Sequence, residues 1–145
     1  MTTVVAKTPK TVVKSTARYI EAVGRRKRAI ARVRATEATK TTWKINDRTL
    51  ENYFCTEELR AIANAPLDRE NFAGKYTVTV KVVGGGIHAQ AEAIRHGLSR
   101  ILVTEDKTQK EELKKLGFIR RDPRKVERKH FGLKKARKAS QWSKR

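Results

Sequence analysis

The chain has 145 residues, of which 35 are Lys or Arg and 15 are Asp or Glu, so its formal net charge is +20. This length allows one compact domain of about 100 residues with tails. The single cysteine, Cys55, excludes a disulfide framework and a thiolate zinc site, and no apolar run reaches the ~18 residues of a membrane helix. We therefore expect a protein of a reducing compartment with a polyanionic partner, no membrane segment, no metal and no cofactor.

The charge is distributed unevenly along the chain. Residues 118–145, called here the C-terminal arm, hold twelve Lys or Arg against two acids and show no apolar periodicity. Such a segment is most favourably ordered against a polyanion, because each cation releases condensed counterions from phosphate. We therefore predict a disordered basic lead (1–17), an α+β RNA-binding body (18–117) and a long extended arm. An organellar import leader is the alternative for the lead, which has three lysines and no acid.

The body begins with two predicted strands, residues 19–23 and 29–35, joined at Gly24 and a basic cluster. In the second strand Ala and Val alternate with Arg and Ile, so one face packs and the other is largely cationic. A third strand is predicted at 43–45, followed by a turn at Asn46-Asp47 and helical segments at 50–54 and 57–63. A fourth strand is predicted at 76–83. It leads to an amphipathic helix of about seventeen residues from Ile87 and then to a short helix at 107–115, which Gly117 closes. Strands followed by helices predict two layers, an α+β fold.

Six basic residues fall in the ten-residue window 25–34, which covers the turn between the first two strands and part of the second strand: Arg25, Arg26, Lys27, Arg28, Arg32 and Arg34. Charge of this kind can simply protect a solvated sheet edge from aggregation. We favour phosphate binding, because no comparable number of acids balances the cluster and both Arg and Lys suit phosphate.

The triple glycine Gly84, Gly85 and Gly86 stands between a strand and a helix. Open backbone N–H groups and a helix N-terminus can hold a phosphate there; close packing of strand, turn and helix is the alternative. The turn is not the phosphate loop of nucleotide hydrolases, because Ile87-His88 stands where Lys-Ser/Thr is required.

His88, Glu92 and His96 form a row on the predicted helix, but the two histidines are eight residues, or about 12 Å, apart. They cannot jointly hold one ion, so we interpret the row as a polar face with local ion pairs. No Ser-His-Asp or paired-carboxylate arrangement is visible, and we expect no catalytic residue. In the arm, Phe118, Phe131 and Trp142 can either stack on unpaired RNA bases or dock on a neighbouring protein.

The chain resembles the family of the ninth protein of the small ribosomal subunit over residues 18–145. The resemblance rests on motifs in one order: Gly24-Arg25-Arg26-Lys27, Ala31-Arg32-Val33-Arg34, Ile45-Asn46, Gly84-Gly85-Gly86 with Gln90, Ala93-Ile94-Arg95-His96-Gly97, Arg121-Asp122-Pro123-Arg124, Val126-Glu127-Arg128-Lys129, Gly132-Leu133-Lys134-Lys135-Ala136-Arg137 and Gln141 with Ser143-Lys144-Arg145. The Ser-Lys-Arg ending resembles the bacterial and organellar branch.

The resemblance implies a two-layer α+β body with a mixed sheet, like the second domain of the fifth small-subunit protein, placed in the subunit head. It implies a structural, non-enzymatic role: the protein binds and stabilises small-subunit rRNA, contacts neighbouring ribosomal proteins, and its arm tip meets the anticodon stem-loop of P-site tRNA through Ser143, Lys144 and Arg145. The expected rRNA contacts are Arg25, Arg26, Lys27, Arg28, Arg32, Arg34, Gly84, Gly85, Gly86, Arg95, Arg120, Arg121, Arg124, Lys125, Arg128, Lys129, Lys134, Lys135, Arg137 and Lys138.

Some residues depart from the family pattern. His88 and Ala89 stand where a small hydroxyl residue and Gly are usual, Glu92 replaces a usual Gly, and Trp142 replaces a usual Phe. His88 and Glu92 leave open whether the glycine turn contacts RNA as in relatives.

Alternatives to a ribosomal role are a free RNA or DNA chaperone and a phosphate-transfer enzyme at the glycine turn. We expect a cytoplasmic ribosome, with a mitochondrial or plastid ribosome as the alternative.

Overall fold

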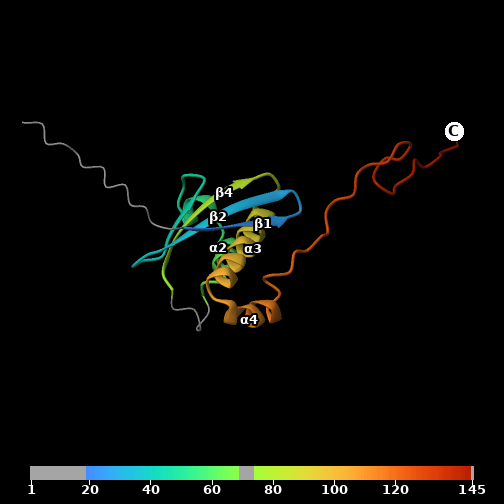
Figure 1. Cartoon of the computed structure of the whole chain (residues 1–145). Helices are drawn as coiled ribbons and strands as arrows, with labels where there is room; N and C mark the ends of the chain where they lie inside the picture. Colours follow the sequence, from blue (N-terminus) through green and yellow to red (C-terminus); the bar gives the residue numbers. More distant parts are fainter. Residues whose placement is uncertain (1–18, 69–73, 145) are drawn as a thin grey trace, which may run out of the picture.

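The computed structural model describes residues 19–68 and 74–144. Predictions for the lead (1–17) and for Arg145 lie outside the described residues. The elements are β1 (Ile20–Arg26), β2 (Ala29–Glu37), β3 (Thr42–Ile45), α1 (Leu50–Tyr53), α2 (Glu57–Asn64), β4 (Tyr76–Val83), α3 (Ile87–Glu105), the 3-10 turn η1 (Lys107–Gln109) and α4 (Lys110–Lys115). All the predicted strands and helices are present, most within two residues of the expected bounds, and they form an α+β fold (Figure 1).

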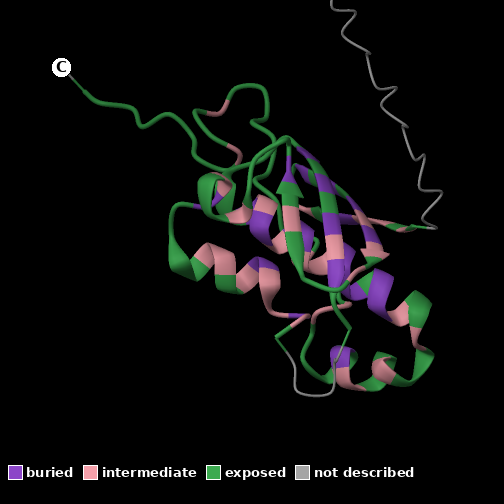
Figure 2. Ribbon diagram, turned by 90° about the vertical axis from the view of Figure 1, so that its left-hand side faces the viewer, coloured by how far each residue is buried: buried purple, intermediate pink, exposed green. Residues whose placement is uncertain are grey.

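The four strands form one mixed sheet in the order β1-β2-β4-β3. β1 with β2 and β2 with β4 pair antiparallel, whereas β3 runs parallel to β4. The predicted alternation is confirmed: on β2 and β4 the buried positions are Ala29, Ala31, Val33, Ala35, Tyr76, Val78, Val80 and Val82. Figure 2 shows buried and exposed residues alternating along the strands. Period two therefore gives the sheet one packed and one open face.

Helix α3 covers the packed face of the sheet (Figure 1), and α2 packs against α3. Its apolar stripe, with Ile94, Leu98 and Ile101 fully buried, completes the core. One predicted member of the stripe is wrong: Ile87 is 59% exposed. It stands on the first turn, beside the exposed glycines, where no described element covers it. Among the described residues, no helix is long and apolar enough to cross a bilayer.

The first strand is longer than predicted. β1 continues through Gly24 to Arg26, so the connection to β2 is the two-residue turn Lys27-Arg28, with Lys27 at φ 50°. Gly24 is buried against Gly97 of α3. A Cβ on Gly24 would clash with the carbonyl oxygen of Ala93 and lie 2.9 Å from the Cα of Gly97. Gly24 therefore serves close strand-helix packing, whereas the sequence suggested a turn.

The predicted turn at Asn46-Asp47 is confirmed, with φ 45° and 67°. The Asn46 amide bonds both backbone groups of Val82, accepting from its N–H at 3.0 Å and donating to its carbonyl at 2.9 Å. The side chain thus imitates one more residue of strand pairing and fixes where β3 ends on β4.

Gly117 ends α4 as predicted, in the left-handed conformation at φ 75°. Its N–H donates to the Lys114 carbonyl, and the Phe118 N–H donates to that of Leu113, the pattern of a Schellman cap. Residues 118–144 contain no helix or strand; their first residues run along the body, and the rest leads away from it (Figure 1). They are not simply extended, because Arg137 donates to Glu127 at 2.6 Å and closes a loop.

Candidate nucleic-acid interface

The close crossing of β1 and α3 brings two basic motifs together. Gly24 and Gly97 have no side chains at the crossing, so the backbones approach closely. The Arg25 N–H donates to Nδ1 of His96 at 3.3 Å, and the Arg100 guanidinium donates to the Val23 carbonyl at 2.7 Å. Residues some seventy positions apart therefore share one surface.

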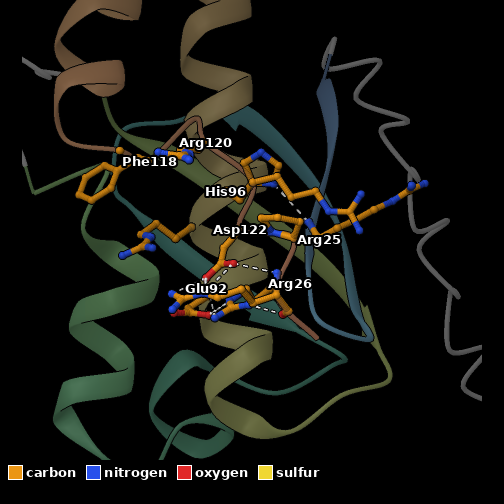
Figure 3. Close-up of a pocket in the computed structure, with 12 residues that line it drawn as sticks. Arg25, Arg26, Glu92, His96, Phe118, Arg120 and Asp122 are labelled. Atoms are coloured by element: carbon orange, nitrogen blue, oxygen red, sulfur yellow. Dashed lines mark hydrogen bonds and ion pairs between the residues drawn. The ribbon is translucent and has the colours of Figure 1, made fainter. Parts of the chain in front are cut away.

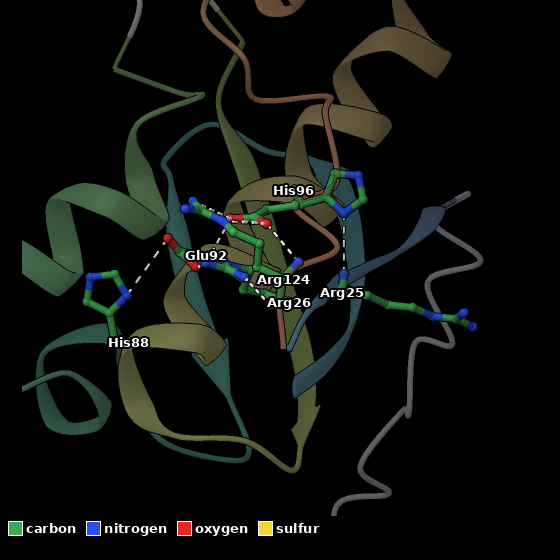
Figure 4. A network of polar contacts seen from close by, with 7 residues as sticks. Arg25, Arg26, His88, Glu92, His96 and Arg124 are labelled. Carbon is green, nitrogen blue, oxygen red and sulfur yellow. Dashed lines mark hydrogen bonds and ion pairs between the residues drawn. The ribbon is translucent and has the colours of Figure 1, made fainter. Parts of the chain in front are cut away.

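Arg26 joins the body to the beginning of the arm (Figure 4). Its guanidinium pairs with Glu92 of α3, pairs with Asp122 at 3.0 Å, and donates to the Arg124 carbonyl at 2.9 Å. These side chains are largely removed from solvent, with 14% of Arg26, 20% of Glu92 and 28% of Asp122 exposed. We call residues 118–124 the arm root, since these contacts hold that segment against α3 and β1.

Asp122 has a low pKa. Hydrogen bonds from the side chain and the backbone N–H of Arg124, with the nearby charge of Arg26, lower it from 3.8 to about 2. The carboxylate therefore stays ionised and keeps its two arginine partners at any physiological pH.

His96 is held neutral. Burial lowers the pKa of its imidazole from 6.5, and the charges of Arg100, Arg121 and Arg95 lower it further against the opposing hydrogen bond to the Ile119 backbone. A group buried among arginines disfavours one more positive charge. Burial is therefore the main cause of the low pKa of His96, and the neighbouring arginine charges act in the same direction.

A cavity of about 500 Å³ lies between the end of β1, one side of α3 and the arm root (Figure 3). Six arginines and two carboxylates line it, a net charge of +4 with His96 neutral. Six of the predicted rRNA contacts line this cavity and come from distant parts of the chain: Arg25, Arg26, Arg95, Arg120, Arg121 and Arg124. The structure thus brings six predicted residues into one site.

The other bases of the first two strands lie elsewhere. Lys27 and Arg28 are exposed on the turn. Arg32 and Arg34 point to the open sheet face, where both pair with Glu21 at 3.2 and 2.7 Å, which raises the pKa of Arg34. Three acids, Glu21, Glu92 and Asp122, thus pair with three of the six bases, so the cluster is partly but not fully balanced.

The glycine turn has a conformational explanation at two positions. Gly84 and Gly85 have φ of 73° and 70°, and a Cβ on either would meet the backbone of the β1–β2 turn or Ala29 within 3 Å. Gly86 has ordinary φ and open space around it. These observations favour the packing interpretation for Gly84 and Gly85; phosphate binding there stays a prediction.

The polar residues His88, Glu92 and His96 of α3 pair only partly with one another. His88 is 60% exposed and lies 3.9 Å from Glu92, whose closer partner is Arg26. His96 turns away toward β1. Within residues 19–68 and 74–144, no three His, Cys, Asp or Glu side chains are grouped to hold a metal ion.

The predicted contacts in the rest of the arm are exposed and separate from the cavity. They are Lys125, Arg128, Lys129, Lys134, Lys135, Arg137, Lys138, Ser143 and Lys144. Arg137 is already paired with Glu127. Phe131 and Trp142 are at least four-fifths exposed, so the body does not use these aromatic side chains.

A sequence profile of the ribosomal protein S9/S16 family matches residues 24–145. The chain belongs to this family. The match includes the β1–α3 crossing, the cavity and the arm, so the family accounts for nearly all the features described above. Members are structural, non-enzymatic proteins of the small ribosomal subunit that bind rRNA and act in translation.

Sequence reasoning found the arginines of the site but missed what positions them. Glu92 was noted as part of a polar row with local ion pairs and as a departure from the family pattern, and Asp122 only as part of a motif. The available signal was that these are two of few acids within strongly basic surroundings. Their shared partner, Arg26, lies 66 residues from Glu92, and no local pattern predicts that contact.

Proposed function

We propose that this ribosomal protein sits in the head of the small subunit and holds rRNA with two basic surfaces. One is the arginine-lined cavity with the neighbouring Lys27-Arg28 turn, and the other is the arm. What carries the proposal is that the family match runs through a segment with twelve Lys or Arg against two acids. A chain of that charge is stabilised chiefly by releasing counterions from phosphate.

The tip of the arm contacts the anticodon stem-loop of P-site tRNA through Ser143, Lys144 and Arg145. Support comes from reach and charge. The arm root is fixed to the body by Arg26, and about twenty residues follow it, which span roughly 65 Å when extended. The loop closed by Glu127 and Arg137 must open for full reach. The exposed ion pair that closes it offers little resistance, and the backbone hydrogen bonds within residues 130–138 break as well.

Deletion of residues 143–145 tests the tRNA contact. Subunits carrying the deletion should assemble normally and retain P-site tRNA less well. The slope of log affinity against log salt should fall by about 0.9 for each phosphate that the tip no longer neutralises. Lys134→Ala with Lys135→Ala removes the same charge from the middle of the arm and is the control. Unchanged tRNA retention at matched salt would show that the tip has no tRNA role.

Sedimentation of a native cell extract tests the assembly role. Stoichiometric migration of the chain with small subunits and whole ribosomes is expected. A pool mainly free at the top of the gradient would instead favour an RNA chaperone. We propose a cytoplasmic ribosome; recovery of the chain from purified mitochondrial or plastid ribosomes, with its first residues removed, would contradict that.

A further inference from the structure

The arginine-lined cavity is larger than a phosphate site requires. Its volume of about 500 Å³ lies within the ~300–1,000 Å³ range of pockets that enclose whole small molecules. A single phosphate group fills only a small part of such a space. Phe118, Pro123 and His96 contribute ring side chains to the rest of the lining.

Charge in the cavity is only partly compensated. Both carboxylates are occupied: Glu92 by Arg26, and Asp122 by Arg26 and Arg124. The other four arginines have no carboxylate partner among the described residues: Arg25, Arg95, Arg120 and Arg121. Burial and Arg100 lower the pKa of His96 most, and Arg121 and Arg95 add smaller contributions in the same direction. The cavity is therefore built to receive an anion.

Arg95 gives the cavity a stacking surface. Its guanidinium carbon lies 5.0 Å from the centroid of the Phe118 ring, a cation–π contact that orients the guanidinium plane. Its Nε is buried and has no hydrogen-bond partner, an unsatisfied donor of a kind that is rare in folded proteins. A guanidinium plane in this setting can stack on an unpaired base.

We propose that the cavity receives one unpaired, extrahelical nucleotide of RNA, with its base stacked on Arg95 and its phosphate held by the unpaired arginines. This inference rests on the proposed rRNA-binding function and names a subsite within it. It also gives Glu92 and Asp122 a purpose: they fix Arg26 and the arm root, which forms one wall of the cavity. The nucleotide would thereby stabilise the arm root in its docked position.

Two RNA hairpins of equal length and charge test the proposal. One carries a single bulged 2-aminopurine, and the other pairs that position. The full-length protein should bind the bulged hairpin about ten-fold more tightly at the same salt, because base stacking contributes roughly this much or more. The 2-aminopurine fluorescence should change on binding as the base leaves one environment for another.

The decisive variant is Arg95→Lys, which keeps the charge and removes the planar stacking group. It should bind the paired hairpin as before and lose the preference for the bulge. Arg48→Lys makes the same exchange at an exposed position outside the cavity and should keep the preference. Phe118→Leu is a second variant, and thermal melting of each variant establishes that it folds.

Equal binding of both hairpins by the unmodified protein would overturn the nucleotide site while leaving salt-dependent RNA binding intact. Loss of the bulge preference in millimolar inorganic phosphate, to the same degree as in a nucleoside monophosphate, would overturn base recognition and leave only a phosphate site. No binding of either hairpin would overturn both this inference and the RNA-binding function on which it rests.

Discussion

Substitution Gly24→Ala tests whether the β1–α3 crossing organises the fold. The added Cβ would meet the backbone of Ala93 and Gly97 well inside van der Waals contact. Backbone atoms cannot rotate away as a side chain can, so the cost is about 3–3.5 kcal/mol, at or just above the upper end of the range typical of overpacking. Alanine also restricts the unfolded chain, which offsets about 0.4–1 kcal/mol. The expected net loss in unfolding free energy is about 2–3 kcal/mol.

Two further glycines provide a graded comparison. Gly97→Ala places a Cβ 2.7 Å from Cγ2 of the buried Val33 and 3.1 Å from the Gly24 nitrogen, a less severe approach than that of Gly24→Ala, and gains about 1 kcal/mol of helix propensity. It should cost less than Gly24→Ala. Gly86→Ala meets nothing within 4 Å at ordinary φ and should change stability by no more than about 0.5 kcal/mol.

Urea unfolding followed by circular dichroism measures the three differences, with thermal melting as a second assay. A loss of 2–3 kcal/mol corresponds to a fall in Tm of roughly 8–24 °C for a body of about 100 residues. If Gly24→Ala stays within about 1 kcal/mol of the parent, or if Gly86→Ala costs as much, the crossing is not the close contact described here. The arrangement of the cavity arginines would then need another explanation.

The remaining predictions concern the arm root. Glu92→Gln removes the charge from its bond with Arg26 at a cost of about 1 kcal/mol, so amide hydrogen exchange in residues 118–122 should become roughly five-fold faster. Glu51→Gln, an exposed charge on α1, is the control, and equal exchange in both variants would contradict the role of Glu92. Because folding lowers the Asp122 pKa from 3.8 to about 2, its stabilisation of the docked root is complete above about pH 4 and is lost as pH falls through 2. NMR titration of the Asp122 carboxylate should give that low pKa, and Asp122→Asn should abolish the loss of root docking at acid pH. Titration of Asp122 near 3.8 would refute its pairing with Arg26 and Arg124.

Much of the fold was predictable because its signals are local. Alternation on β2 and β4 identified the buried face of the sheet, and the spacing of Ile94, Leu98 and Ile101 identified the packed face of α3. Gly117 marked the C-terminal end of α4. Ile87 was misassigned because the helical period extends to the first residue of α3 whether or not anything covers the first turn.

The arginines of the site were also predictable, since composition and motif order identify them. Their arrangement was not, as Arg34 shows: its partner Glu21 was visible in the sequence, but strand register decides that the two lie opposite each other.

The sequence by itself determined the partner class, the α+β elements and the family, because charge density, residue periodicity and motif order are all properties of neighbouring residues. Only the tertiary structure decided that Gly24 packs closely against α3. It also decided that Arg26 pairs with Glu92 and Asp122, and that Arg95 lines a cavity. The physical reason is that a long-range ion pair depends on where the chain returns in space. That return is set by the packing of the whole core, which no single segment encodes.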